Sequence, residues 1–81
     1  MVHNYVPEEG TLVKTVTTVY ADPDGTGFYT LTSGAFEKLQ PGTVGVVEGT
    51  EVAGPGRTII LTVRFPGDFR ARLGPSAWEL A

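Results

Sequence analysis

The chain has 81 residues and a formal net charge of −3, and it contains no cysteine. This length suits one domain with a single apolar core, and the lack of cysteine excludes a disulfide framework and a thiolate metal site. Apolar residues make up 41% of the sequence and charged residues 19%, which excludes a disordered chain, while the acidic balance argues against a dedicated binder of duplex nucleic acid.

The first ten residues, MVHNYVPEEG, lack the basic and then apolar pattern of a signal peptide. No apolar run in the sequence approaches the roughly 18 residues that a membrane helix needs. We therefore expect a cytoplasmic protein without a membrane partner. Residues 1–10 are predicted to form a flexible N-terminal arm, and residues 11–81 the folded domain.

Glycine and proline then separate runs that are rich in β-branched and aromatic residues. Eleven glycines and six prolines are too many for helices of ordinary length, so the chain is predicted to be all-β. In the run TLVKTVTTVY, residues 11–20, apolar residues fall at both odd and even positions. This indicates a bulge near Thr17 and Thr18 or burial on both faces of the strand. DPDGTG predicts a turn, and residues 28–34 the returning arm of a hairpin.

The middle of the chain holds AFEKLQ, residues 35–40, the one stretch with helix-forming composition. Because proline and glycine follow at once, we expect no more than a short plug helix or loop there. TVGVVEG predicts a strand with Val44 and Val46 on one face and Val47 on the other. EVAGPGR, residues 51–57, predicts a loop.

The C-terminal third carries the strongest strand pattern, TIILTVRF, residues 58–65. Its alternation predicts an apolar inner face and a mostly polar outer face that includes Arg64. PGD predicts a tight turn, and FRARL a strand with Arg70 and Arg72 outward. GPSAWEL predicts one helical turn followed by a short strand that carries Trp78. The residues predicted to seal the interior are Ile59, Leu61, Val63, Phe65, Phe69 and Leu73.

This order of elements, with LQPGTVGVVEG, TIILTVRFPGDFRARL and GPSAWEL, resembles the SH3-like small β-barrel proteins. The resemblance covers about residues 11–81 and is one of pattern, without a specific family motif. It implies a single barrel of five to six antiparallel strands with one short helical or 3₁₀ turn, in which residues 16–31 form the long first loop. It implies little about activity, because this barrel hosts many unrelated functions.

Two members of that group are poor matches. The polyproline-binding modules display paired tryptophans and an acidic cluster in the first loop, whereas this chain has Asp22, Asp24, Phe28 and Tyr29 there. The small plasmid-borne dihydrofolate reductases carry a Val-Gln-Ile-Tyr run where this chain has FRAR. Neither activity is therefore expected.

No residue pattern indicates catalysis, a metal or a cofactor. His3 is the lone histidine, so neither a histidine pair for zinc nor a serine, histidine and acid trio can form. Asp22 and Asp24 resemble the start of a calcium loop, but the third acidic ligand and the distant glutamate are missing. We expect a protein that is not an enzyme.

Arg64, Arg70 and Arg72 are predicted to share the outer face of one hairpin, where cross-strand neighbours lie about 5 Å apart. Their charges repel unless Glu48 or Glu79 lies between them. The row is then either a solvated, salt-bridged face or a docking patch for an acidic partner surface. With the aromatic side chains of Tyr29 and Trp78, these arginines are our candidate partner-binding residues.

These observations favour a non-enzymatic protein-interaction or assembly subunit that binds a larger protein partner. One alternative is an accessory barrel that binds single-stranded nucleic acid through Arg57, the arginine row, and Tyr29 or Trp78. Another is a small oligomeric enzyme with its site at a symmetry axis. A homodimer through Ile60, Val47 and Thr62 on the outer face is a further hypothesis, and so is a phage or mobile-element origin, for which no residue pattern argues.

Overall fold

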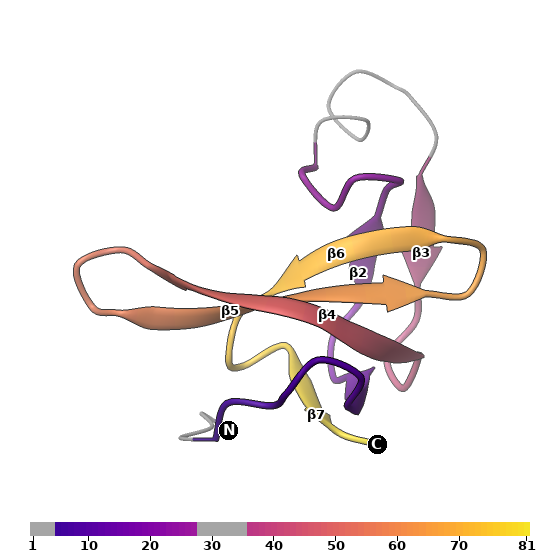
Figure 1. Ribbon diagram of the computed structural model, residues 1–81. Helices are drawn as coiled ribbons and strands as arrows, with labels where there is room; N and C mark the ends of the chain where they lie inside the picture. Colours follow the sequence, from indigo (N-terminus) through magenta and orange to yellow (C-terminus); the bar gives the residue numbers. More distant parts are fainter. Residues whose placement is uncertain (1–4, 28–35) are drawn as a thin grey trace.

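The computed structural model describes residues 5–27 and 36–81. The expected hairpin arm at residues 28–34, with Tyr29, lies outside the described residues. Within them the chain forms strands and turns and no helix, and every strand pair is antiparallel (Figure 1). The strands are β1 (Leu12–Thr15), β2 (Val19–Ala21), β3 (Glu37–Leu39), β4 (Val44–Ala53), β5 (Thr58–Phe65), β6 (Phe69–Leu73) and β7 (Trp78–Leu80).

The strands form two sheets, one with the order β6-β5-β4-β1-β7 and one that pairs β2 with β3. A main-chain bridge links them: Asp22 N donates to Arg70 O at 3.0 Å, and Arg70 N donates to Asp22 O at 2.6 Å. The all-β class is confirmed, with seven described strands in place of the five to six expected. The sheets do not close into a barrel within the described residues, so the closed barrel stays a prediction.

The predicted long first strand is divided into β1 and β2 by a bend at residues 16–18. At this bend Val16 N donates to Ala77 O at 3.0 Å. The hydroxyl of the buried Thr15 donates to Gln40 O at 3.1 Å and accepts from Thr43 N at 3.2 Å. The inward residues of the two strands, Val13 in β1 and Val19 in β2, both lie at odd positions. The apolar residues at even positions, Leu12, Val16 and Tyr20, are exposed, so burial on both faces is not found. The register irregularity lies in β4 instead, between Val47 and Gly49.

The short plug helix expected at residues 35–40 is not found over residues 36–40, the part of that range that the structure describes. Residues 37–39 form β3, in which Lys38 pairs with Tyr20 and Leu39 with Val19. A helix this short cannot recover the cost of its first turn, whereas the extended segment gains a pairing partner in β2. Leu39 also packs against the apolar core.

The loop expected over residues 51–57 is shorter in the structure. β4 continues to Ala53, which pairs with Thr58, so the turn holds only residues 54–57. Arg57 closes it in the left-handed region, with φ 55, and donates its N–H to Gly54 O at 3.2 Å. The resulting β4–β5 hairpin projects beyond the rest of the molecule in Figure 1.

The alternation predicted for β5 is confirmed, because Leu61, Val63 and Phe65 are buried and Arg64 is exposed. Ile59 and Phe69 are partly buried against the same core. The buried core residues are Val13, Val19, Ala21, Val47, Leu61, Val63, Phe65, Ala71, Leu73 and Trp78.

Of the two C-terminal turns, the tight PGD turn follows the prediction, whereas the turn before β7 is not the helical turn that was expected. Asp68 N donates to Phe65 O at 3.2 Å across the PGD turn, in which Gly67 takes the positive φ of 89 that suits glycine. Ala77 N donates to Gly74 O at 3.0 Å in a single turn before β7. At the other end, Pro7 is buried and Gly10 N donates to Val47 O at 2.8 Å, so this part of the expected arm lies against the sheet.

Candidate functional site

The outer face of the five-stranded sheet carries the predicted arginines. In register across the strands lie Leu12 of β1, Val46 of β4, Arg64 of β5 and Arg70 of β6. Arg72 is one pleat further along β6, opposite Thr62. The structure therefore brings the three arginines together on one face, as the alternation predicts, and continues their row into apolar residues.

Glu48 lies between Arg64 and Arg70 and compensates both charges. Its Oε2 is 3.2 Å from Arg64 Nε, and its Oε1 accepts a hydrogen bond from Arg70 Nε at 2.7 Å. Glu48 is the extra residue at the irregularity between Val47 and Gly49, and such a bulge re-aims a side chain. Of the two acids proposed from the sequence, Glu48 performs this role, whereas Glu79 pairs with Lys14 at 3.4 Å.

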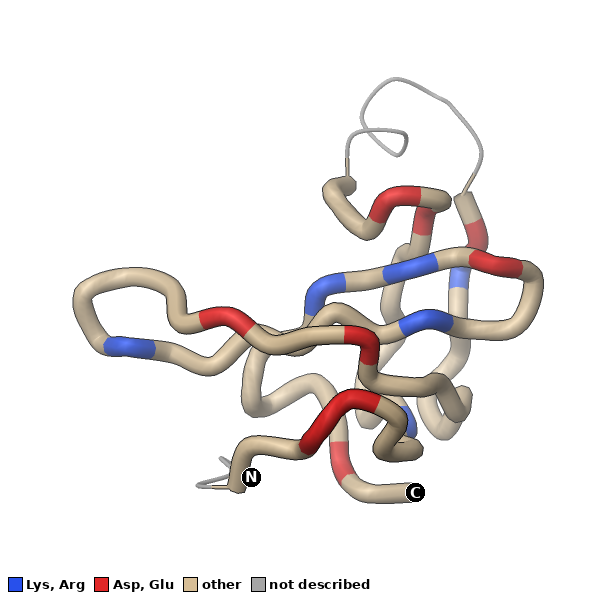
Figure 2. Tube along the Cα trace, viewed as in Figure 1, with Lys and Arg blue, Asp and Glu red and all other residues tan. Residues whose placement is uncertain are grey.

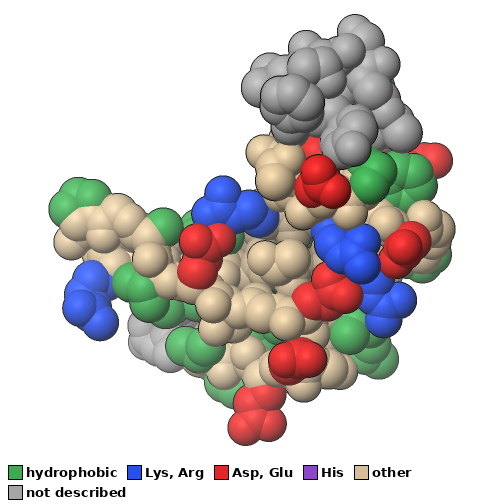
Figure 3. Space-filling view, turned by 45° about the horizontal axis from the view of Figure 1, so that its top comes forward, with side chains coloured by type: hydrophobic (Ala, Val, Ile, Leu, Met, Phe, Trp, Pro, Cys, Tyr) green, Lys and Arg blue, Asp and Glu red, His purple; other side chains and the backbone are tan. Residues whose placement is uncertain are grey.

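The remaining charges of the row are also paired. Arg72 contacts a single oxygen of Glu51, with Nη2 at 2.6 Å and Nε at 2.8 Å. Asp68 Oδ1 is 3.4 Å from Arg70 Nη2. Figure 3 shows basic side chains beside acidic ones on this face, and Figure 2 marks where basic and acidic residues lie along the backbone. Three arginines thus face three carboxylates, and the row has no net charge.

Arg70 holds the first loop in place. Its Nη1 donates to Pro23 O at 3.0 Å, in addition to the main-chain bridge between Arg70 and Asp22. The hydrogen bond to Glu48 raises the pKa of the Arg70 guanidinium above its ordinary value, against the opposing effect of desolvation. The donors of Arg70 are used within the chain, and its side chain is only 27% exposed. Its hydrogen bonds therefore stabilise the fold.

Asp22 organises the loop that Arg70 holds. Its side chain is buried, and its carboxylate accepts hydrogen bonds from Asp24 N at 3.1 Å, Gly25 N, and Gly27 N at 2.7 Å. Both glycines have positive φ, so the predicted turn is confirmed. The carboxylate is satisfied by the main chain, and over residues 5–27 and 36–81 no cluster of acidic, histidine or cysteine side chains could hold a metal ion.

Of the two aromatic candidates, Trp78 is the one within the described residues, and it does not join the row. Trp78 is 2% exposed and belongs to the core, so its indole is not part of this surface. Among the described aromatic residues, Tyr5, Tyr20 and Phe36 are exposed. The rings of Tyr20 and Phe36 lie 6.1 Å apart, on the β2–β3 side of the molecule.

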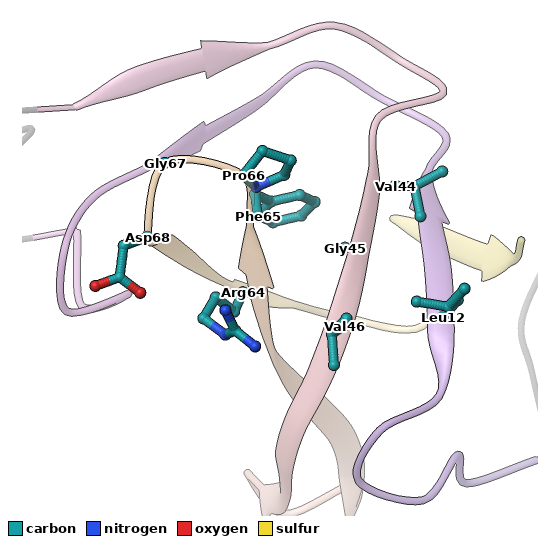
Figure 4. Close-up of a pocket in the computed structure, with 9 residues that line it drawn as sticks. All are labelled: Leu12, Val44, Gly45, Val46, Arg64, Phe65, Pro66, Gly67 and Asp68. Carbon is teal, nitrogen blue, oxygen red and sulfur yellow. The ribbon is translucent and has the colours of Figure 1, made fainter.

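An apolar hollow of about 280 Å³ lies beside Arg64 (Figure 4). Leu12, opposite Val46, is 54% exposed, and Val44 is 43% exposed. The β5–β6 turn closes one side with Pro66 and Asp68. Its full lining is Leu12, Val44, Gly45, Val46, Arg64, Phe65, Pro66, Gly67 and Asp68.

Sequence reasoning missed this hollow. The alternation placed Val44 and Val46 on one face and Val47 on the other, and the homodimer hypothesis put Val47 on the outer face. Val47 is fully buried, so it cannot contribute to the homodimer surface for which it was considered with Ile60 and Thr62. The signal available in the sequence was a pair of valines on the face opposite to a core valine.

Comparisons with family models, with curated proteins and with solved structures found no match to this chain. In the part of the chain that the structure describes, no helix is long and apolar enough to cross a membrane.

Proposed function

We propose that this chain is an SH3-like barrel that acts in the cytoplasm as a non-enzymatic interaction or assembly subunit. It binds a larger protein partner through the outer face of β1, β4 and β5. The strand order β7-β1-β4-β5-β6, the single turn before β7 and the bridge from Asp22 to Arg70 support the barrel. The absence of cysteine fits a reducing compartment.

The observation that carries the proposal is the apolar group around the hollow. Single exposed apolar residues are normal on a protein surface. Here two of them, Leu12 and Val44, are joined by the partly buried Val46, which lies opposite Leu12 and two residues along β4 from Val44. The hollow, at about 280 Å³, is slightly smaller than the range of about 300–1,000 Å³ that is typical of small-molecule sites. A site of this size and openness suits a side chain presented by another protein.

The alternative of single-stranded nucleic acid has less support from the site. Binding of that kind needs an excess of cationic groups and aromatic rings on which bases stack. The arginine row is compensated by Glu48, Glu51 and Asp68. Trp78, the aromatic candidate that the structure describes, is buried.

The test compares two substitutions on the same strand. Val44→Glu places a charge in the hollow, whereas Val52→Glu places one at the far end of β4, where the side chain is 53% exposed. We expect affinity purification from the native host to recover a protein with the wild type and with Val52→Glu, and not with Val44→Glu. Calorimetric titration of that purified protein then measures the same loss directly.

Equal recovery with both variants would overturn the proposed surface. Binding of the wild type to single-stranded oligonucleotides with a steep salt dependence would favour the nucleic-acid alternative. Analytical ultracentrifugation of both variants tests whether the partner is a second copy of the chain. A dimer that only Val44→Glu dissociates would identify this face as a homodimer interface.

A further inference from the structure

Arg64 differs from the other two arginines of the row in its hydrogen bonds. Arg70 donates from Nε, Nη1 and Nη2, and Arg72 donates from Nε. Arg64 makes an ion pair with Glu48 at 3.2 Å, but among the described residues it donates no hydrogen bond. Its side chain is 46% exposed. A guanidinium carries five N–H donors, so Arg64 retains donor capacity that the fold does not use.

Arg64 is placed so that its unused N–H donors lie at the hollow. Arg64 lies directly opposite Val46 in the β4–β5 register, and its side chain lines the apolar hollow (Figure 4). The hollow therefore combines an apolar wall with a planar cation at its rim. A carboxylate is the group whose geometry matches the two parallel N–H bonds of a guanidinium.

We propose that the hollow binds an extended segment of a protein partner in which one apolar side chain fills the hollow and an Asp or Glu carboxylate binds Arg64. This inference rests on the proposed function and specifies the partner of the same surface. In an extended segment, residues i and i+2 point to the same side, about 6.6 Å apart. The recognised pattern is therefore an apolar residue and an acidic residue separated by one position.

Asp68 limits the acidity of that segment. Its side chain is 75% exposed and lines the same hollow at the β5–β6 turn. If the partner segment carried a second acidic residue next to the first, Asp68 would repel it. The net charge of −3 likewise disfavours a strongly acidic partner at long range. The apolar contact is thus required together with the single carboxylate, and an acidic peptide without an apolar residue does not bind.

The experiment uses capped hexapeptides and ¹⁵N-labelled protein. The probe contains one leucine and, two positions away, one glutamate, with threonine elsewhere; a second peptide has glutamine in place of the glutamate, and a third has serine in place of the leucine. We expect the probe to shift the amide signals of Val44, Val46 and Arg64. Both altered peptides should bind at least about tenfold more weakly, because a hydrogen bond to a charged group or an apolar burial is lost.

The matched variants are Arg64→Gln and Arg72→Gln, since both arginine side chains are 46% exposed on the same face. Arg64→Gln should weaken the probe by at least about tenfold and leave the glutamine peptide unchanged. Arg72→Gln should bind both peptides as the wild type does. Thermal melts of the two variants verify that each is folded.

The inference is overturned if the probe does not shift these signals, or if Arg64→Gln binds it as tightly as the wild type. A fourth peptide has a free C-terminal carboxylate on an apolar last residue and no acidic side chain, and it tests whether a terminal carboxylate is the preferred group. Tighter binding of that peptide would overturn the assignment to an acidic side chain. Failure of the probe while the host partner still depends on Val44 would refute this inference and leave the proposed function standing.

Discussion

Replacing Gly45 with alanine should destabilise the protein strongly, because the new methyl group has no space. A Cβ at Gly45 would lie 2.6 Å from Val63 Cγ1 and 2.8 Å from Phe65 Cδ1. Both neighbours are buried core side chains, 0% and 2% exposed, and the Arg64 carbonyl oxygen lies 2.9 Å from the same position. Neither side chain can move without disturbing the close-packed core, so relieving the overlap requires unfavourable shifts of the core or of the backbone.

The expected loss is at the upper end of the overpacking range, about 2–3 kcal/mol in the free energy of unfolding. In a domain of this size that corresponds to a fall in Tm of roughly 10–20 °C. Circular dichroism during thermal and urea unfolding measures it. Gly49→Ala is the control on the same strand, since nothing lies within 4 Å of its Cβ position. A Gly45→Ala variant within about 0.5 kcal/mol of the wild type, or one no less stable than Gly49→Ala, would refute the packing argument.

Two further predictions concern the loop that follows β2, which the main-chain bridge between Asp22 and Arg70 links to the five-stranded sheet. Asp22→Asn should lower the free energy of unfolding by about 1–3 kcal/mol, because an amide cannot accept hydrogen bonds at both positions and its NH₂ group would face a main-chain N–H such as that of Gly27. Asp24→Asn is the control, since Asp24 is exposed. Equal urea midpoints for the two variants would contradict this prediction. Arg70→Ala should lower Tm more than Arg72→Ala, because Arg70 also donates a hydrogen bond to a loop carbonyl, whereas an exposed ion pair such as that of Arg72 contributes about 0–1 kcal/mol. The reverse order of Tm in calorimetry would refute the role of Arg70 in holding the loop.

The candidate site could be predicted from the sequence only in part. The shared face of Arg64, Arg70 and Arg72 followed from alternation, which is local. The pairing of Arg64 and Arg70 with Glu48 depended on a bulge in β4, and no local sequence pattern predicts that bulge. The burial of Trp78 was also decided at a distance, by the pairing of β7 with β1.

The sequence by itself determined the elements whose signals lie within a few residues of one another. These are the alternation of β5 and β6, the turn that Gly67 permits, and the loop in which Asp22 bonds its own backbone. A period of two and a turn chemistry are properties of neighbouring residues, so they can be recognised without knowledge of the fold.

Only the tertiary structure decided which segments pair, and therefore which faces are covered. It divided residues 11–20 between two sheets and made residues 37–39 a strand because β2 was there to pair with them. It also turned Val44 outward and Val47 inward, and so created the hollow beside Arg64. The energy of a short segment is set by its distant partners, and a surface is whatever those pairings leave exposed.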